Sequence, residues 1–234
     1  MAMTSPAAAI VDITAASTAP ADVLSAFDAI LPSEAILLRT VTRPDGALRT
    51  LRAERAGMFE WTPLVEGPGH WEVEVHRRDA RPGALRGVRE ALSWDHARLD
   101  GLEQAASEAW KAAQVRSASR FHLRFAFGLQ RHIRFEESVL FPAFDRTTGM
   151  DADRGPTAVM RLEHRMIEER LAEIREAAAR CVPPAERSRA DLLALLEMHD
   201  TKEENILYPM LDRSLEPREA DALVYLFQAM DPVE

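Results

Sequence analysis

The sequence contains two copies of one unusual pattern, in which a histidine and a glutamate four residues apart interrupt an apolar helical stripe. The first copy, HIRFEESVLFP, begins at His132, and the second, HDTKEENILYP, begins at His199. Residues at intervals of three and four share one side of a helix, so each pair lies on the apolar side. An unpaired carboxylate is costly to bury. Because no Lys or Arg lies beside Glu136 on that face, another positive charge must compensate it.

The second half of the chain is an internal duplication with a helical pattern. Equivalent histidines lie 68 residues apart for His96 and His164, and 67 apart for His132 and His199. Six positions of the two motif helices match: 132/199, 136/203, 137/204, 140/207, 142/209 and 145/212. Long helices are expected near 85–114, 118–145, 156–181 and 186–213, and a short one at 217–230. Four such helices joined by short loops predict an up-down four-helix bundle.

The first part of the chain, residues 1–80, has a different sequence pattern, in which short segments typical of strands and of helices alternate. The expected elements are strands at 10–14 and 35–41, helices at 20–31 and 47–57, and a hairpin over 58–78. The order βαβαββ predicts a small two-layer α+β domain. His70 and His76 alternate with apolar residues on the last strand, so both are expected to face solvent. A polar linker near 77–85 separates this domain from the all-α domain, 81–234.

Composition excludes several classes of protein. With 47% hydrophobic and 29% charged residues, the 234-residue chain is of the folded globular type. A net charge of −9 argues against a nucleic-acid partner. Cys181 is the only cysteine, which excludes an internal disulfide and a cysteine-based metal site. No apolar run approaches the roughly 18 residues of a membrane span, and no signal-peptide pattern is present. We therefore expect a cytoplasmic protein with no membrane partner.

Helical geometry separates the acids that point into the bundle from those that do not. At 100° per residue, both motif glutamates fall near the centre of an apolar arc. Asp100 and Glu168 follow the histidines of the first and third helices, but lie about 110° and about 90° from the arc centres. They are expected outside the core. The inward set is His96, His132, Glu136, His164, His199 and Glu203.

These residue types predict a metal site. A lone histidine such as His122 is more often a structural residue than a ligand, but four symmetrically spaced histidines with two buried glutamates are different. Imidazoles and carboxylates converge on a cation, whose charge compensates the glutamates. Six nitrogen and oxygen ligands without a thiolate suit iron, manganese or zinc. Two carboxylates shared among four helices suggest two ions, because a bridging carboxylate both neutralises and spaces a pair.

The segments DHARLD, HIRFEESVLFP, EHRMIEERL and HDTKEENILYP resemble the hemerythrin-like, or HHE cation-binding, family over about residues 85–215. The resemblance implies an up-down bundle with a non-haem di-iron centre. In it, His96 and His164 are single-histidine ligands, and the two histidine–glutamate pairs supply terminal imidazoles and bridging carboxylates. Classical oxygen-carrying hemerythrins have a second histidine where this chain has Glu168. The pattern is closer to a bacterial subgroup that includes iron-centre repair proteins.

The resemblance leaves three functions open. The leading hypothesis is a di-iron protein that binds O2, NO or peroxide for sensing, storage or detoxification. The second is an enzyme that decomposes peroxide or NO, or repairs iron centres. The third is a non-catalytic metal-binding sensor module, in which residues 1–80 contact a protein partner. Those residues resemble a domain of unknown function related to sulfur-carrier proteins, without the carrier's reactive cysteine. Two iron ions are expected, and zinc or manganese could replace them on overproduction.

Overall fold

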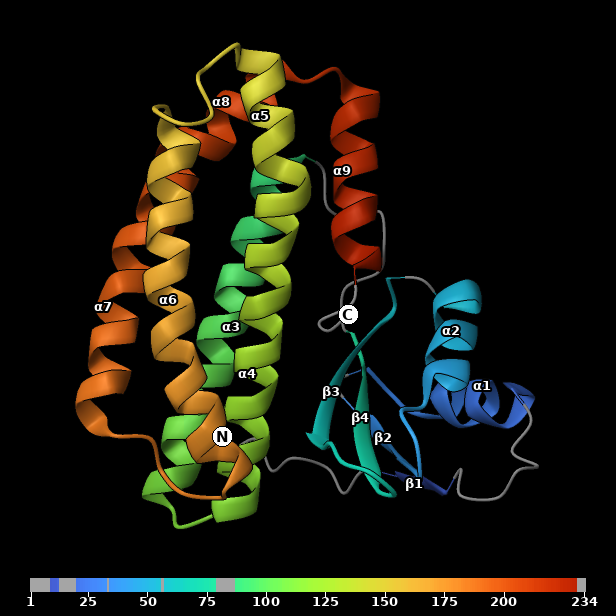
Figure 1. Ribbon diagram of the computed structural model, residues 1–234. Coiled ribbons are helices and arrows are strands. Elements are labelled where there is room, and N and C mark those ends of the chain that lie inside the picture. The colour runs from blue at the N-terminus through green and yellow to red at the C-terminus, as the bar shows by residue number, and fades with distance from the viewer. Residues whose placement is uncertain (1–8, 13–19, 33, 56, 79–86, 231–234) are drawn as a thin grey trace. The chain divides into compact units, whose positions relative to one another are not determined.

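The computed structural model (Figure 1) describes residues 9–12, 20–32, 34–55, 57–78 and 87–230. The chain forms two compact units, of which the first ends at Ala84 and the second begins at Leu85.

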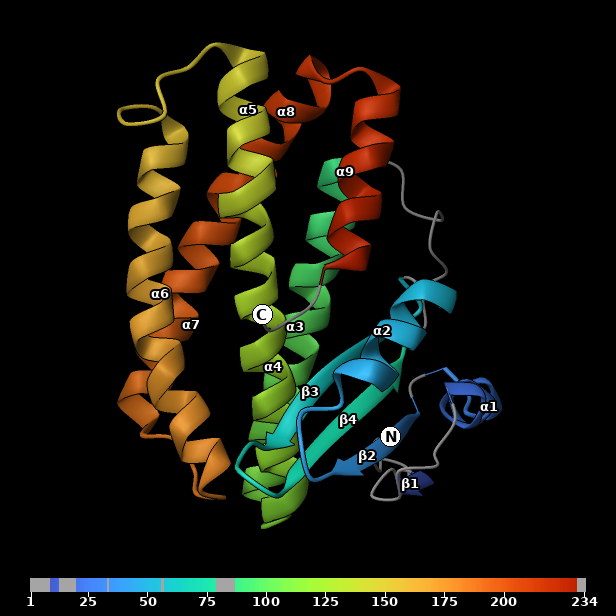
Figure 2. The same ribbon diagram turned by 45° about the vertical axis from the view of Figure 1, so that its right-hand side comes forward.

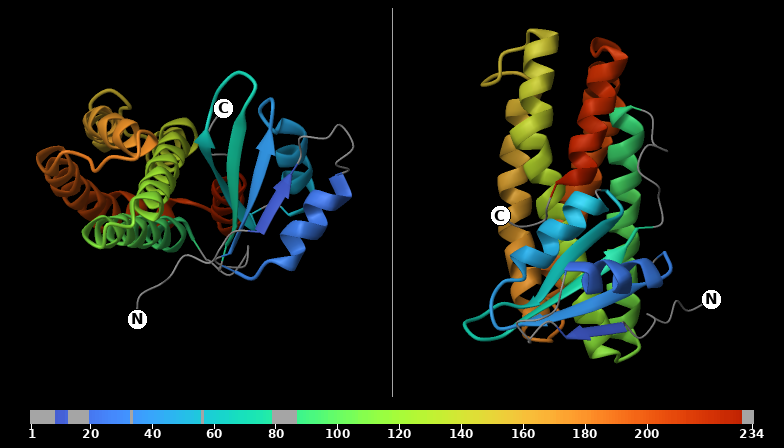
Figure 3. Two further views of the ribbon diagram at one scale, coloured as in Figure 1. Left: turned by 90° about the horizontal axis from the view of Figure 1, so that it is seen from below. Right: turned by 90° about the vertical axis from the view of Figure 1, so that its right-hand side faces the viewer.

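The first unit is a sheet with two helices on one face (Figure 3). Its elements are β1 (Ala9–Asp12), α1 (Pro20–Ala29), β2 (Ala35–Thr40), α2 (Asp45–Glu54), β3 (Phe59–Val65) and β4 (Trp71–Arg77). The strand order is β1-β2-β4-β3, with β1 parallel to β2 and the other neighbours antiparallel. The predicted βαβαββ order and two-layer architecture are therefore confirmed.

The strand β4 lies between β2 and β3, and four consecutive residues of it are buried. Val73 and Val75 are fully buried on one face, as their apolar character requires. Glu74 and His76 alternate with them and are buried as well, with the His76 Nε2 atom 3.3 Å from Glu74 Oε1. The expectation that His76 faces solvent was wrong, whereas His70 is exposed. Alternation shows which residues share a face of a strand, but not whether that face is covered.

The second unit is an up-down helical bundle (Figure 2). Its helices are α3 (Val88–Lys111), α4 (Val115–Phe135), α5 (Phe141–Thr148), α6 (Pro156–Ala179), α7 (Glu186–Lys202), α8 (Tyr208–Ser214) and α9 (Pro217–Ala229). Two short π-helical turns, η1 (Glu136–Leu140) and η2 (Glu203–Leu207), join α4 to α5 and α7 to α8. Each joined set runs as one long rod, so four long helices form the bundle, as the sequence predicts. The short final helix, α9, packs beside α3.

Each π turn begins at a motif glutamate. The N–H of Phe141 donates to the carbonyl of Glu136, and the N–H of Tyr208 donates to the carbonyl of Glu203. Both hydrogen bonds join residues that are five apart, whereas those of a regular α-helix join residues four apart. The next residue in each copy is a proline. In a regular helix the proline ring would clash with the carbonyl four residues earlier, and the wider turn moves that carbonyl aside. Such turns occur frequently at functional sites.

Two apolar clusters fill the bundle above and below the motif residues. One contains Val88, Leu92, Phe135, Leu140, Phe141, Phe144, Met160, Leu207, Tyr208, Leu211 and Phe227. The other contains Leu99, Leu102, Phe125, Leu129, Ile133, Ile167, Leu171, Ile174, Leu192 and Leu196. Along its helix, each histidine lies between residues of one cluster and residues of the other. The polar side chains are therefore enclosed between two apolar layers. Within the described part of the chain, no helix is long and apolar enough to cross a membrane.

Candidate metal centre

The six residues expected to point inward all lie inside the bundle. His96 is on α3, His132 on α4, His164 on α6 and His199 on α7, while the glutamates begin the two π turns. Their exposed fractions do not exceed 6%, and both glutamates are fully buried. Burial of so many titratable groups is costly unless they are compensated, which makes their mutual arrangement decisive.

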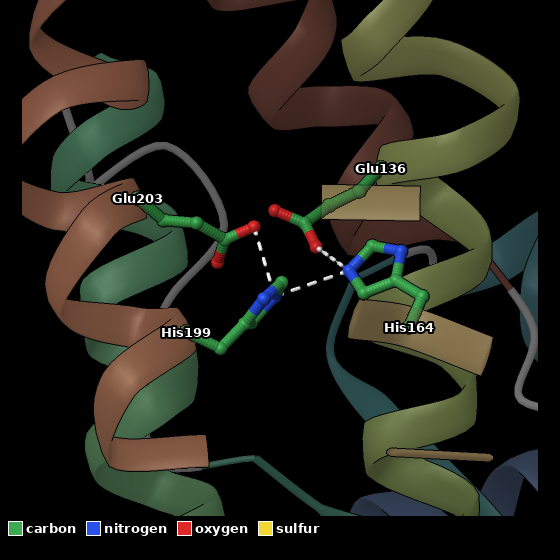
Figure 4. Close-up of side chains that lie close together, drawn as sticks. All are labelled: Glu136, His164, His199 and Glu203. Atoms are coloured by element: carbon green, nitrogen blue, oxygen red, sulfur yellow. Dashed lines mark hydrogen bonds and ion pairs between the residues drawn. The ribbon is translucent and has the colours of Figure 1, made fainter. Parts of the chain in front are cut away.

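One group of four ligand atoms gathers around His164 and His199 (Figure 4). The Nε2 atoms of these two histidines are 3.1 Å apart. Glu136 Oε2 lies 3.3 Å from His164 Nε2, and Glu203 Oε1 lies 3.1 Å from His199 Nε2. Bonds of about 2.0–2.2 Å to one ion place neighbouring ligand atoms about 3 Å apart. The distances within this group therefore match those between neighbouring ligand atoms around a single metal ion.

A second group gathers around His96 and His132, whose Nε2 atoms are also 3.1 Å apart. Glu203 Oε2 lies 3.5 Å from His96 Nε2, and Glu136 Oε1 lies 3.6 Å from His132 Nε2. Each glutamate thus directs one oxygen to each histidine pair. Glu136 Oε2 and Glu203 Oε1 are buried and accept no hydrogen bond from the described residues. Orphaned carboxylate oxygens facing imidazole nitrogens fit cations between them.

A carboxylate orients every one of the four imidazoles from behind. The Nδ1 atoms contact these carboxylates at 2.9–3.1 Å: His96 with Glu204, His132 with Asp95, His164 with Glu137, and His199 with Glu163. An Nδ1–H donated to a carboxylate leaves Nε2 free as a lone-pair donor, which is typical of metal-binding histidines.

Sequence reasoning did not single out Asp95 and Glu163 as partners of the histidines. They immediately precede His96 and His164, so the repeated acid–histidine pair was the available signal. The partners are also crossed between helices: Asp95 contacts the histidine of α4, and Glu163 contacts that of α7. A crossed arrangement of this kind depends on helix packing, which local spacing does not show.

Tyr208 is a further residue of the site that the sequence pattern did not reveal. Its side chain is fully buried, and its hydroxyl oxygen lies 2.6 Å from Glu136 Oε1 and 2.7 Å from Glu203 Oε2. The same oxygen is 3.3 Å from His132 Nε2 and 3.5 Å from His96 Nε2. The equivalent position of the first copy is Phe141, so the available signal was the change from LFP to LYP.

The charges of the metal-free site show how strongly it favours a cation. Burial by itself lowers the pKa of His132, but the Glu136 carboxylate and the hydrogen bond to Asp95 raise it to about 10. Burial likewise opposes charge on His164, but the nearby carboxylates of Glu136 and Glu137 raise its pKa to about 10. Although burial raises the pKa of Glu136, His132 and His164 hold it well below its ordinary range. Without a metal ion, protons on the imidazoles supply the positive charge that the glutamates need.

Comparison with known proteins identifies the family. The family model of the hemerythrin HHE cation-binding domain matches residues 88–211. The chain belongs to the hemerythrin HHE cation-binding family. No curated protein and no solved structure gave a match. Together, the family and the buried groups of histidine and glutamate make this a metal-binding hemerythrin-like protein.

The hemerythrin HHE match covers all four helices that carry the histidines, whereas residues 9–78 lie outside it. The two remaining acids of the pattern, Asp100 and Glu168, lie within the match but are exposed at the bundle surface. Burial of their flanks raises the pKa of both carboxyl groups, but neither carboxylate reaches the buried groups. Glu168, at the position where the resemblance led us to expect a further histidine in classical hemerythrins, is exposed and belongs to neither group of ligand atoms.

Proposed function

We propose that the second unit is a non-haem di-iron domain that binds a small oxidant, O2, NO or peroxide. The observation that carries the proposal is that each of the two buried glutamates directs one oxygen to each of two histidine pairs. Two imidazoles and two carboxylate oxygens would then hold each ion, with both carboxylates as bridges.

The donor set is suited to iron, although not to iron alone. Neutral imidazoles with carboxylates suit iron, manganese and zinc, and the described residues contribute no thiolate to the site. Bound ferrous ions would supply electrons to a small oxidant that reaches them. Zinc or manganese could fill the same positions in an overproduced protein, so the metal content of native material decides the identity.

The protein groups leave room for a small ligand. Four imidazole nitrogens and four carboxylate oxygens supply eight donor atoms, whereas two octahedral ions offer about twelve positions. Metal sites that react or bind ligands keep such open positions. The apolar clusters on either side exclude water, and the carboxylates behind the imidazoles hold each ring in place. The arrangement therefore favours direct binding of a diatomic molecule or peroxide at the ions.

The test is metal analysis of protein purified without oxygen, followed by absorption spectra before and after exposure to O2, NO or peroxide. We expect two iron ions per chain and a spectral change on exposure. Glu136→Ala combined with Glu203→Ala should abolish the pair of ions while the helical circular dichroism is retained. Asp100→Ala and Glu168→Ala are the matched controls, since both acids are exposed, and each should keep its iron.

Two results would contradict the proposal. The first is full iron content in the double glutamate variant, which would show that the carboxylates do not bridge. The second is a loaded protein whose spectrum is unchanged by all three oxidants. Multiple turnovers of peroxide or NO would instead assign the site to an enzyme that decomposes them, with the same ligands.

A further inference from the structure

We propose that the phenol oxygen of Tyr208 is an additional ligand of the metal ion held by His96 and His132. This inference rests on the proposed di-metal site and adds to it a seventh protein ligand, which belongs to one ion only. The family match concerns a cation-binding domain as a whole and assigns no role to this tyrosine.

The first argument is the position of the hydroxyl oxygen. It lies 2.6 Å from Glu136 Oε1 and 2.7 Å from Glu203 Oε2, and it lies 3.3 Å from His132 Nε2. The distance to His96 Nε2 is 3.5 Å. Four separate donor atoms therefore surround it at about the spacing of neighbours around a single ion. The histidine and glutamate atoms of this group also contact one another, at 3.1, 3.5 and 3.6 Å, without the tyrosine.

The second argument is that hydrogen bonding alone does not account for both short contacts. A phenol carries one hydrogen, so it can donate to one carboxylate at a time. The other carboxylate oxygen then faces the phenol oxygen with no hydrogen between them, and two electron-rich atoms at that distance repel each other. A cation shared by the three oxygens removes the repulsion.

The third argument comes from the internal duplication. At the His164–His199 position, four residues converge, but at the His96–His132 position His96, His132 and Glu203 are the only described residues that meet this mutual spacing. Tyr208 supplies an oxygen on the side that has fewer groups. Its counterpart Phe141 has no donor atom and stacks on the ring of His164, with ring centroids 5.4 Å apart.

The consequence is that the two ions differ. Coordination replaces the phenol O–H bond with a metal–oxygen bond, and the proton leaves to a buffer base, so no oxidant or reductant is required. The ion at His96 and His132 then has one open position fewer than its neighbour. A small ligand such as azide therefore enters at the His164–His199 ion, beside the apolar ring of Phe141.

The test uses the full chain loaded with ferric iron and records its visible absorption and resonance Raman spectra. A phenolate bound to ferric iron gives a visible charge-transfer band and enhanced ring vibrations. The chain contains only two tyrosines, and the second, Tyr225, is 60% exposed. We expect the band in the wild type and in the matched control Tyr225→Phe, and its complete loss in Tyr208→Phe at unchanged iron content.

The Tyr225→Phe variant also decides the matter if Tyr208→Phe does not fold, because Tyr208 is then the only tyrosine that can produce a phenolate signal. Two bound irons with no phenolate signal in Tyr225→Phe would overturn the inference and leave the di-iron proposal intact. Absence of bound iron from the wild type would overturn both. A band that survives Tyr208→Phe would likewise exclude Tyr208 as its source.

Discussion

The two halves of the bundle place the same ligand types at equivalent positions but compensate them differently. In the first half, the carboxylate behind His132 is Asp95, which also accepts hydrogen bonds from Arg98 and Arg131. In the second half, the carboxylate behind His199 is Glu163, which pairs with Lys202. The first carboxylate is fully buried with a buried guanidinium, whereas the second group lies closer to solvent.

The helix α9 adds a second difference. Its Phe227 packs against the ring of His132 with centroids 5.8 Å apart, and against Phe135 at 5.0 Å. The guanidinium of Arg131 lies over the same Phe227 ring at 4.9 Å. Since α9 follows the duplicated segment, it has no counterpart within the duplication, and it covers only the first half of the site.

These differences show which features a duplication preserves. Positions that must converge on a shared centre stay equivalent, because helix geometry determines where their side chains point. The residues that contact the imidazole Nδ1 atoms need only supply a carboxylate paired with a cation. Asp95 with its arginines and Glu163 with Lys202 both do so. Two otherwise similar metal positions can thereby acquire different affinities, since the partners of a ligand tune its basicity.

The largest effect should come from removing one glutamate at a time. Each glutamate directs one oxygen to each pair of histidines, but among the described residues only Glu203 lies within the mutual ligand spacing of both pairs. Glu203→Ala leaves the His96–His132 pair without a carboxylate at this spacing, so it should lose more metal than Glu136→Ala, which leaves Glu203 beside both pairs. Metal analysis measures the difference, and circular dichroism confirms the fold. Equal retention by the two variants would show that the halves are equivalent after all.

The next effect concerns the two carboxylates behind the histidines. Asp95→Ala leaves the guanidinium of Arg131 buried without its partner, and breaking a buried ion pair costs about 3–5 kcal/mol of unfolding free energy. Glu163→Ala releases Lys202, whose side chain is one-third exposed and can turn to solvent, but it also leaves the buried Nδ1 of His199 without its partner, so we expect a smaller loss of about 1–3 kcal/mol. Urea denaturation of both metal-free variants tests the comparison. Similar losses would mean that burial of Asp95 does not dominate its energetics.

Much of the bundle could be predicted from the sequence, for an identifiable reason. A glutamate at the centre of an apolar stripe is informative, because burial of an uncompensated carboxylate is rarely tolerated. Its repetition 67 residues later, at Glu203, gave both the helix pairing and the composition of the site. The two histidine–glutamate pairs follow from this spacing, and His96 and His164 from a separate repeat of 68 residues; the structure brings all six residues together in two groups.

The features that could not be predicted depend on three-dimensional packing or on residues with two possible interpretations. Tyr208 occupies an apolar position, where an aromatic ring is usually a core residue, and its hydroxyl meets the glutamates only across the π turn. The π turns themselves follow from a proline that also fits an ordinary helix start. His76 was placed in solvent because alternation does not report what covers a sheet face.

The smallest effect contrasts the halves at the far end of the bundle, where His122 and Arg189 occupy equivalent positions of the duplication. The Nδ1 atom of His122 accepts a hydrogen bond from the Trp110 indole at 3.1 Å, which requires that nitrogen to be unprotonated. Burial lowers the pKa of His122 to about 4, and the charge of Arg189 acts in the same direction. Arg189 stays charged beside Glu103.

A histidine whose pKa is lowered on folding stabilises the protein fully above its unfolded pKa, about 6.5, and progressively less as the pH falls toward 4. Between pH 7.5 and pH 5 the native state should lose about 2 kcal/mol through this group. His122→Asn keeps an acceptor for Trp110 but cannot be protonated, so the free-energy advantage of the wild type over the variant should shrink by that amount. Urea denaturation of the metal-free proteins at both pH values gives this difference, in which the titration of the other histidines cancels. A free-energy advantage that is the same at both pH values would show that His122 does not become protonated on unfolding in this range. The two halves would then not differ at this end through the titration of His122.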